Sequence, residues 1–258
     1  YFACKLCADL CDKYGIDAKK PVLWCAWILA LLPYSIYCGT HAHGEMFAAV
    51  LVVLSCDLAL RKKEFLAGLL LGLTLAIKVD LAVAGFCLGV WYLVSKNFKR
   101  GTALLLGALP GLLIMGYVDK LTWGVWFQNA LTHAHANLVE EVGNQWGVSP
   151  WYTHFIYFLS MTSIFGAVAT LALPKIWKKL TPAHKSLWFL CLGFVAVFSF
   201  VAHKEKRFMA VLIYIELAAS IPTVFLFLKN SSGFANALKK KNLQLLLAFG
   251  LLVHFATD

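Results

Sequence analysis

Long apolar stretches, separated by short charged or polar breaks, run along almost the whole of this chain. About nine such stretches lie at 22–38, 45–60, 65–77, 81–95, 102–117, 151–173, 187–202, 208–228 and 243–256. A membrane-spanning helix takes about 20 mostly apolar residues, so the pattern predicts an all-α, polytopic transmembrane helix bundle. The stretches at 65–77 and 81–95 are short and are separated by Lys78-Val79-Asp80. A tight hairpin, two tilted helices and one re-entrant pair all fit them.

The composition supports a membrane protein and excludes a soluble domain. Of the 258 residues, 61% are hydrophobic and 14% are charged, and the mean hydropathy is +0.75. We expect a single membrane-embedded domain over 1–258, surrounded by membrane lipid. The net charge of +10 does not indicate nucleic-acid binding, because Lys and Arg flank the apolar stretches instead of forming one basic face. The chain starts at Tyr1 with no signal-peptide pattern, and we expect it to be an internal fragment.

The distribution of basic residues predicts which face each loop occupies. Eighteen of the 23 Lys and Arg residues fall in loops on one side of the predicted helices, and the positive-inside rule makes that side cytoplasmic. The long loop at 118–150 and the charged turn at 203–207 then lie on the opposite, lumenal or periplasmic face. We expect a multi-pass protein of the endoplasmic reticulum membrane in a eukaryote, or of the plasma membrane in a bacterium.

The eight cysteines form neither a disulfide framework nor a metal site in the sequence pattern. Most lie in apolar stretches, where Cys acts as a small hydrophobe. Cys4, Cys7 and Cys11 fall on one face of a helix, but no fourth ligand is nearby, so we expect no bound metal.

The loop at 118–150 and the residues just after it combine aromatic with polar side chains. Trp and Tyr side chains suit the boundary between water and lipid, which predicts an interfacial helix that caps the bundle. The same side chains also suit a polar substrate, because aromatic rings and amides are good platforms for a sugar. The candidate substrate-binding residues are Asp119, Trp123, Asn137, Trp146, Trp151 and Tyr152, and beyond these His133 and His135.

The sequence His203-Lys204-Glu205-Lys206-Arg207-Phe208 places five charged or titratable residues in a row between two apolar stretches. Charge at membrane depth is costly unless it has a function or a partner. The plain alternative is a solvated turn with snorkelling side chains. Arg offers a planar fork to phosphate oxygens and Lys a point charge, so the cluster also suits an anionic substrate.

Several motifs occur in order between 119 and 208, and together they resemble a known family. The order is Asp119, Trp123-Gly124, Asn137, Trp146-Gly147-x-Ser149-Pro150-Trp151-Tyr152 and His203-Lys204-Glu205-x-Arg207-Phe208. This order resembles the Alg9/PIG-B-type mannosyltransferases, which are polytopic GT-C enzymes of glycosyltransferase family 22. The last hexamer is the most specific part. Upstream, Thr40 and Glu45 also fit the family's pattern, while the rest of that turn departs from it.

The resemblance implies an inverting transfer of mannose from a polyprenyl-phosphate mannose, dolichyl-phosphate mannose in eukaryotes, to a lipid-linked glycan of the GPI- or N-glycan-precursor type. It implies that His203, Lys204, Glu205 and Arg207 bind the donor phosphate, with no further cofactor. The family's catalytic base is expected in a first lumenal loop upstream of Tyr1, so we expect the isolated chain to be inactive.

A polytopic transporter or flippase with a polar site on the non-cytoplasmic face is the alternative, and a non-catalytic membrane scaffold is a third interpretation. Transporters often show internal repeats and a charged site near mid-membrane, and neither pattern is visible in this sequence.

Overall fold

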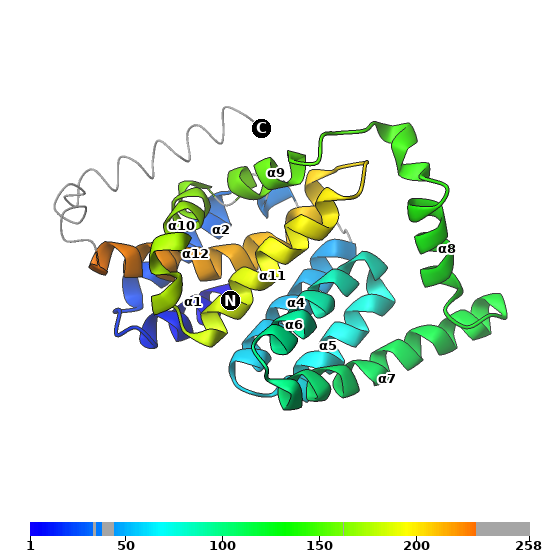
Figure 1. The fold of residues 1–258 in the computed structure, drawn as a ribbon, viewed down its shortest axis with the longest axis horizontal. Coiled ribbons are helices and arrows are strands. Elements are labelled where there is room, and N and C mark those ends of the chain that lie inside the picture. Colours follow the sequence, from blue (N-terminus) through cyan, green and yellow to red (C-terminus); the bar gives the residue numbers. More distant parts are fainter. Residues whose placement is uncertain (33–34, 38–43, 162, 231–258) are drawn as a thin grey trace. The chain divides into compact units, whose positions relative to one another are not determined.

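The computed structural model describes residues 1–32, 35–37, 44–161 and 163–230, and every regular element in them is helical (Figure 1). With 3₁₀ helices written as η, the elements are α1 (Phe2–Asp12), α2 (Lys19–Leu31), α4 (Gly44–Leu60), α5 (Glu64–Ile77), η1 (Val79–Leu81), α6 (Ala82–Val94), α7 (Phe98–Trp123), α8 (Gln128–Leu138), η2 (Val142–Trp146), α9 (Thr153–Met161), α10 (Ser163–Ile176), η3 (Trp177–Lys179), α11 (Pro182–Ser199), η4 (Lys206–Met209) and α12 (Ala210–Asn230). Thr40 and the predicted stretch at 243–256 lie outside the described residues.

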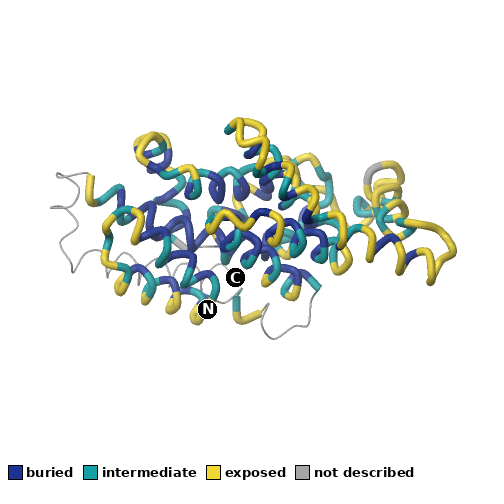
Figure 2. Tube along the Cα trace, turned by 90° about the horizontal axis from the view of Figure 1, so that it is seen from below, coloured by how far each residue is buried: buried dark blue, intermediate teal, exposed yellow. Residues whose placement is uncertain are grey.

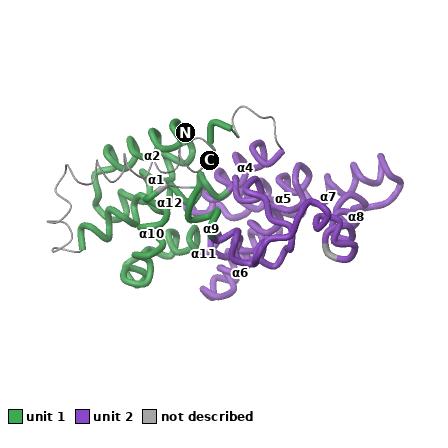
Figure 3. The backbone as a smooth tube through the Cα atoms, turned by 90° about the horizontal axis from the view of Figure 1, so that it is seen from above, with its two compact units in different colours: residues 1–42, 156–188, 212–258 green, residues 43–155, 189–211 purple. Residues whose placement is uncertain are grey.

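The helices group into two compact units, which Figure 3 colours separately. Unit 1 comprises residues 1–42, 156–188 and 212–258, and unit 2 comprises residues 43–155 and 189–211. The candidate residues that follow all belong to unit 2.

Three helical segments within the described residues are long and apolar enough to cross a membrane. They are α7, α11 and the 25-residue segment Lys206–Asn230. A fourth arises if α9 and the helix Ile164–Lys179, bent by 113° from each other, form one broken span. The all-α fold class is therefore confirmed for the described residues, with three or four candidate membrane spans.

The described residues do not show nine separate spanning segments. The predicted stretches at 65–77 and 81–95 form α5, with 14 residues, and α6, with 13. At a rise of 1.5 Å per residue each helix is about 20 Å long, while the hydrocarbon core is about 30 Å thick. The polar break at 78–80 separates them and forms most of η1, and the stretch at 151–173 is divided between α9 and α10.

Helices α5 and α7 pack in backbone contact along a seam of glycines. A Cβ atom added to Gly72 in α5 would lie 2.4 Å from the carbonyl oxygen of Ala108 in α7. On the other side of the seam, a Cβ atom on Gly111 would lie 2.2 Å from the carbonyl carbon of Gly72. Small residues allow membrane helices to approach this closely. The seam therefore fixes η1, which follows α5, relative to the end of α7.

In unit 1 a buried hydrogen-bond network joins α11 and α12 to the turn after α1. The Tyr14 hydroxyl donates to Nδ1 of His184 over 2.8 Å, and Nε2–H of His184 donates to the carbonyl of Ala219 over 2.9 Å. Trp188 Nε1–H donates to the Thr223 hydroxyl over 3.0 Å. Buried polar groups need partners, and this network supplies them inside an apolar core.

Candidate functional site

The turn at residues 203–207, called here the signature turn, is organised around the carboxylate of Glu205. It follows α11 and runs into η4. Oε1 of Glu205 lies 2.8 Å from Nε2 of His203 and accepts a hydrogen bond from Nη2 of Arg207 over 2.9 Å. Oε2 of Glu205 also contacts Nε of Arg207. Glu205 therefore grips the Arg207 guanidinium in a two-point contact and holds the His203 ring at the same time.

Both ring nitrogens of His203 face an acceptor. Nδ1 lies 2.9 Å from the carbonyl oxygen of Gly147, which follows η2. The hydrogen bond to Glu205, followed in importance by that to Gly147, raises the pKa of His203 above its ordinary value. Burial favours the neutral form of Glu205, but the hydrogen bonds from His203 and Arg207 outweigh it and lower the pKa of Glu205. The turn thus favours a charged His203 and a charged Glu205 together.

Lys204 is buried, and its side chain turns back onto its own chain. Its exposed fraction is 7%, and Nζ donates to the carbonyl of Val201. Burial lowers the pKa of Lys204, because removal from water disfavours the ammonium form. Arg207, by contrast, has half of its side chain exposed.

A second group of charges lies where α4 begins and α5 ends. Glu45, in the first turn of α4, is buried, and its Oε1 lies 3.2 Å from Nζ of Lys78. The same ammonium lies 3.5 Å from Oδ2 of Asp80 in η1. Oδ1 of Asp80 contacts Nε2 of His133 on α8. Burial favours the neutral form of Glu45, but a backbone hydrogen bond and the Lys78 ammonium outweigh it and lower the pKa of Glu45.

Asp119 caps α8. Its exposed fraction is 5%, and its Oδ2 accepts a hydrogen bond from the backbone N–H of Asn129 over 2.9 Å. The first N–H groups of a helix have no partner within the helix, and no side-chain cap bond forms at the N-cap residue Phe127. The Asp119 carboxylate, which belongs to α7, therefore accepts one of these N–H groups from outside α8. One turn later, at His133, the contact with Asp80 attaches the helix a second time.

The remaining candidates lie at the end of α7, on α8 and on the segment after it, and this region is mostly exposed (yellow at the right of Figure 2). Trp123, Trp146 and Trp151 have exposed fractions of 69%, 76% and 72%. Tyr152 packs edge to face against Trp151, with ring centroids 5.8 Å apart.

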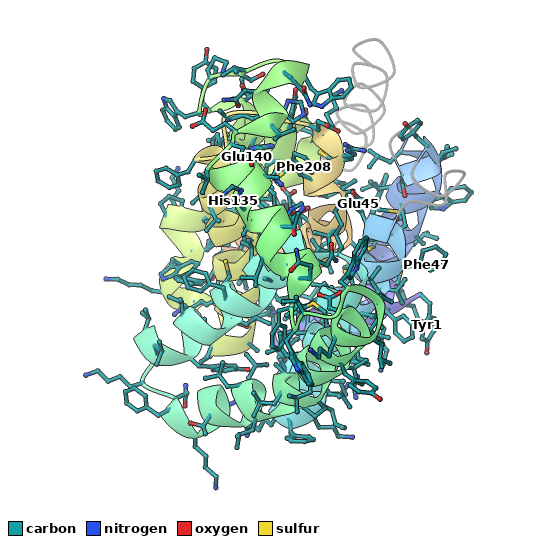
Figure 4. All side chains as sticks on the ribbon, turned by 90° about the vertical axis from the view of Figure 1, so that its right-hand side faces the viewer. Tyr1, Glu45, Phe47, His135, Glu140 and Phe208 are labelled. Carbon is teal, nitrogen blue, oxygen red and sulfur yellow. The ribbon has the colours of Figure 1, made fainter. Side chains whose placement is uncertain are left out.

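Two further polar side chains of α8 make local contacts. Asn137 donates to the backbone carbonyl of His133 over 2.9 Å. His135 pairs with Glu140 over 3.3 Å, and both are well exposed (labelled in Figure 4). These contacts lie within the α8 segment and do not reach the signature turn.

The structure thus joins some candidates and leaves others apart. It connects Glu45 with His133, and it connects three members of the signature turn with each other. The predicted site residues did not include Lys78, Asp80 or Gly147, although Gly147 belongs to the motif that indicated the family. For the first two, the available signal was a pair of opposite charges in the short break between apolar stretches.

A metal centre finds no support in the described part of the chain. Nowhere in residues 1–32, 35–37, 44–161 and 163–230 do three or more His, Cys, Asp or Glu side chains gather as metal ligands. In the described site, the positive groups that an anion can meet are side chains such as those of Lys204 and Arg207.

Comparison with known proteins gives a consistent picture over most of the chain. A family model described as the Alg9-like mannosyltransferase family matches residues 2–257. A probable Dol-P-Man:Man(7)GlcNAc(2)-PP-Dol alpha-1,6-mannosyltransferase of Schizosaccharomyces pombe is 29% identical over 140 residues, which are 52% of this chain and 24% of that protein. GPI mannosyltransferase 3 of Trypanosoma brucei brucei is 26% identical over 237 residues, 81% of this chain and 39% of that protein.

The mannosyltransferase APTG1 of Arabidopsis thaliana is 27% identical over 144 residues, 54% of this chain and 25% of that protein. The chain therefore spans about a quarter to two fifths of the length of these curated relatives. No solved structure matches it.

Proposed function

Because this chain belongs to the Alg9-like mannosyltransferase family, we propose that its protein transfers mannose from a polyprenyl-phosphate mannose to a lipid-linked glycan. In a eukaryote the donor is dolichyl-phosphate mannose, and the acceptor is a GPI or N-glycan precursor. The reaction inverts the anomeric configuration. The observation that carries the proposal is the signature turn, in which one carboxylate contacts both the His203 ring and the Arg207 guanidinium.

The chemistry of the donor explains why such a turn is needed. When the bond between mannose and phosphate breaks, the phosphate leaves with the electron pair and gains negative charge. Cations held in place before the reaction stabilise that charge without reorganising. Arg207 presents a planar fork to the phosphate oxygens, and His203 adds a second charged donor. Glu205 orients both, and Lys204 contributes positive charge from inside the turn. These side chains supply the charge without a metal ion or a cofactor.

The segment from Trp123 to Tyr152 is proposed to lie at the lumenal membrane surface and to receive the acceptor glycan. Its exposed Trp side chains match the water–lipid boundary. Asn137 is also exposed, so its side chain can hydrogen-bond to a sugar hydroxyl. On this interpretation the described helices are part of a larger GT-C bundle in the endoplasmic reticulum membrane. The catalytic base then lies upstream of Tyr1.

The test is substitution of Arg207 in the gene product that contains this chain, assayed in microsomes with radiolabelled dolichyl-phosphate mannose. Arg207→Ala should reduce transfer by at least about 100-fold, because it removes a charged donor at the leaving group. Arg207→Lys should restore little of it, since a point charge replaces the fork. Lys99→Ala, at an exposed basic residue of unit 2, is the control and should leave transfer unchanged.

Near-normal transfer by Arg207→Ala at equal protein level refutes the phosphate role. Complementation of yeast strains that each lack one mannosyltransferase of this family then identifies the acceptor. Growth of no strain, together with absent transfer to any lipid-linked glycan, refutes the proposed activity.

A further inference from the structure

Polar contacts in unit 2 form a series that leads from the start of α4 through α8 to the signature turn. The series runs from Glu45 to Lys78, Asp80 and His133, along α8 and η2 to Gly147, and on through His203 and Glu205 to Arg207. Its steps are ion pairs, hydrogen bonds or the chain itself. Apart from the Gly147 carbonyl and the chain of α8 and η2, every member is a charged or titratable side chain.

We propose that Asp80 is a positioning residue of the transferase, which sets α8 in place over the signature turn. The proposal rests on the proposed function, because it assigns the acceptor to the α8 segment and the donor phosphate to the turn. The two carboxylate oxygens of Asp80 contact different partners, one at the end of α5 and one on α8.

Asp80 is the residue at which this series of contacts passes from α4 and α5 to α8. Its Oδ2 pairs with Lys78, which is anchored to the buried Glu45, and its Oδ1 contacts His133. The Asp80 side chain is only 19% exposed, so water screens these contacts weakly. Replacing the carboxylate by an amide removes the charge that both neighbours face. Lys78 then keeps only the Glu45 carboxylate as its ionic partner, and His133 loses the charged Asp80.

The position of α8 depends on few other contacts. Most of its residues are exposed, so apolar burial cannot fix it. Asp119 holds the first turn at Asn129, and beyond α8 the carbonyl of Gly147, which follows η2, contacts His203. Asp80 contacts the helix between these two points, at His133. Without that contact, α8 keeps Asp119 at its start and is held next only after η2.

A transferase with substrates on two segments is sensitive to displacement of α8. The acceptor oxygen must approach the sugar carbon to about 3 Å, and displacement by about 1 Å can cost about 100-fold in rate. The signature turn keeps its own internal contacts when Asp80 is changed. The acceptor side should therefore be affected more than the donor side, which separates positioning from general loss of structure.

The first test measures kinetics on the protein that contains this chain. Asp80→Asn should raise the KM for the acceptor glycan about tenfold, the order expected for losing a hydrogen bond between charged groups. The KM for the polyprenyl-phosphate donor should stay within about twofold of wild type. Asp80→Glu, which keeps the charge, should recover part of the loss. Asp57→Asn is the matched control, because Asp57 pairs with Arg61 about 18 Å along α4 from Glu45.

The second test does not depend on activity. Glu140 and Glu141 are exposed just after α8, so an endoproteinase that cleaves after Glu reports how firmly the helix is held. In detergent-solubilised protein, Asp80→Asn and His133→Gln should each speed cleavage at this site about tenfold, and the double variant should add little to either one. His133→Gln removes the contact with Asp80 by changing its more exposed partner. This variant therefore replaces Asp80→Asn in the test if the Asp80→Asn protein does not accumulate.

The outcomes separate this inference from the proposed function. Unchanged acceptor KM and unchanged cleavage in Asp80→Asn overturn the positioning role, even if Arg207→Ala abolishes transfer. Equal rises in the KM of donor and acceptor also overturn it, because the effect is then general. If the wild-type protein transfers mannose to no lipid-linked glycan, the proposed function fails, while the cleavage experiment still decides whether Asp80 fixes α8.

Discussion

Gly147 offers the sharpest test of how α8 and η2 serve the signature turn. Its backbone has φ 105° and ψ 149°, a region that only glycine adopts without strain. No atom lies within 4 Å of a Cβ added there, so Gly147→Ala introduces backbone strain and no clash. The same residue supplies the carbonyl that faces Nδ1 of His203. The substitution therefore acts on His203 through the backbone alone.

The magnitude follows from two alternatives open to the variant chain. Keeping the observed backbone costs about 1–3 kcal/mol of strain. Relaxing to an allowed conformation turns the carbonyl away and loses a hydrogen bond to a charged ring, worth about 1.5–3 kcal/mol. The variant takes the cheaper course, so we expect a loss of about 2 kcal/mol at the turn. That corresponds to a fall of about 30-fold in kcat/KM for mannose transfer.

A second consequence concerns the ionisation of His203. Its pKa is raised first by Glu205 and then by the Gly147 carbonyl. If the carbonyl turns away, the pKa of His203 falls toward its ordinary value. Activity that needs the charged ring should then decline at a lower pH in Gly147→Ala than in wild type.

The assay is mannose transfer from dolichyl-phosphate mannose, measured across pH at matched protein levels. Gly124→Ala is the control, because Gly124 also has a positive φ, 77°, with no atom within 4 Å of an added Cβ. It ends α7 and has no contact with His203, so strain alone should cost it about 1 kcal/mol of stability. Equal activity and equal pH profiles in the two variants would refute the reasoning.

Two further predictions follow from the site and from the helix seam. The His203 contacts stabilise the turn fully below the ordinary His pKa of about 6.5 and are lost as pH rises through the raised value. The Glu205 contacts are present above about pH 4.3 and are lost as pH falls through its lowered pKa. Protection of the turn from proteolysis should therefore be greatest between these two limits. A protection profile that does not change with pH over this range would contradict the prediction. In the seam, Gly72→Ala should destabilise the solubilised protein by about 1–3 kcal/mol, because its Cβ meets a backbone oxygen at 2.4 Å. Gly89→Ala in α6, with open space around its Cβ, should be neutral or stabilising by up to about 1 kcal/mol; equal melting temperatures would contradict this interpretation of the seam.

The sequence carried the fold class and the family, and particular residues explain why. Apolar stretches interrupted by Lys and Arg have few structural solutions other than membrane helices. The ordered motifs from Asp119 to Phe208 were sufficient to indicate the family, which the match over residues 2–257 confirms. Such motifs keep their order in the chain whatever the helices do, so no tertiary information is needed to recognise them.

The arrangement of the site could not be obtained in the same way. Asp80 and His133 are 53 residues apart, and nothing in either neighbourhood indicates that they meet. Asp119 belongs to a predicted substrate loop, yet its carboxylate caps α8, a contact that depends on the reversal of the chain at Gly124 and Phe127. The seam between α5 and α7 brings the backbones of Gly72 and Gly111 together across 39 residues of sequence. Hydropathy does not encode these pairings.

A carboxylate at the centre of a turn proposed to bind phosphate has a physical reason. Without Glu205, the positive charges of Arg207 and His203 would repel each other, and the two side chains would have no fixed orientation. One carboxylate between two cations fixes their directions and still leaves the turn positive, because Lys204 and Lys206 lie beside them. A turn made only of cations would also bind the released polyprenyl phosphate tightly, and equally strong binding of product and transition state does not speed turnover. The Glu205 contacts therefore favour fixed direction over maximal charge, which is what a leaving phosphate requires.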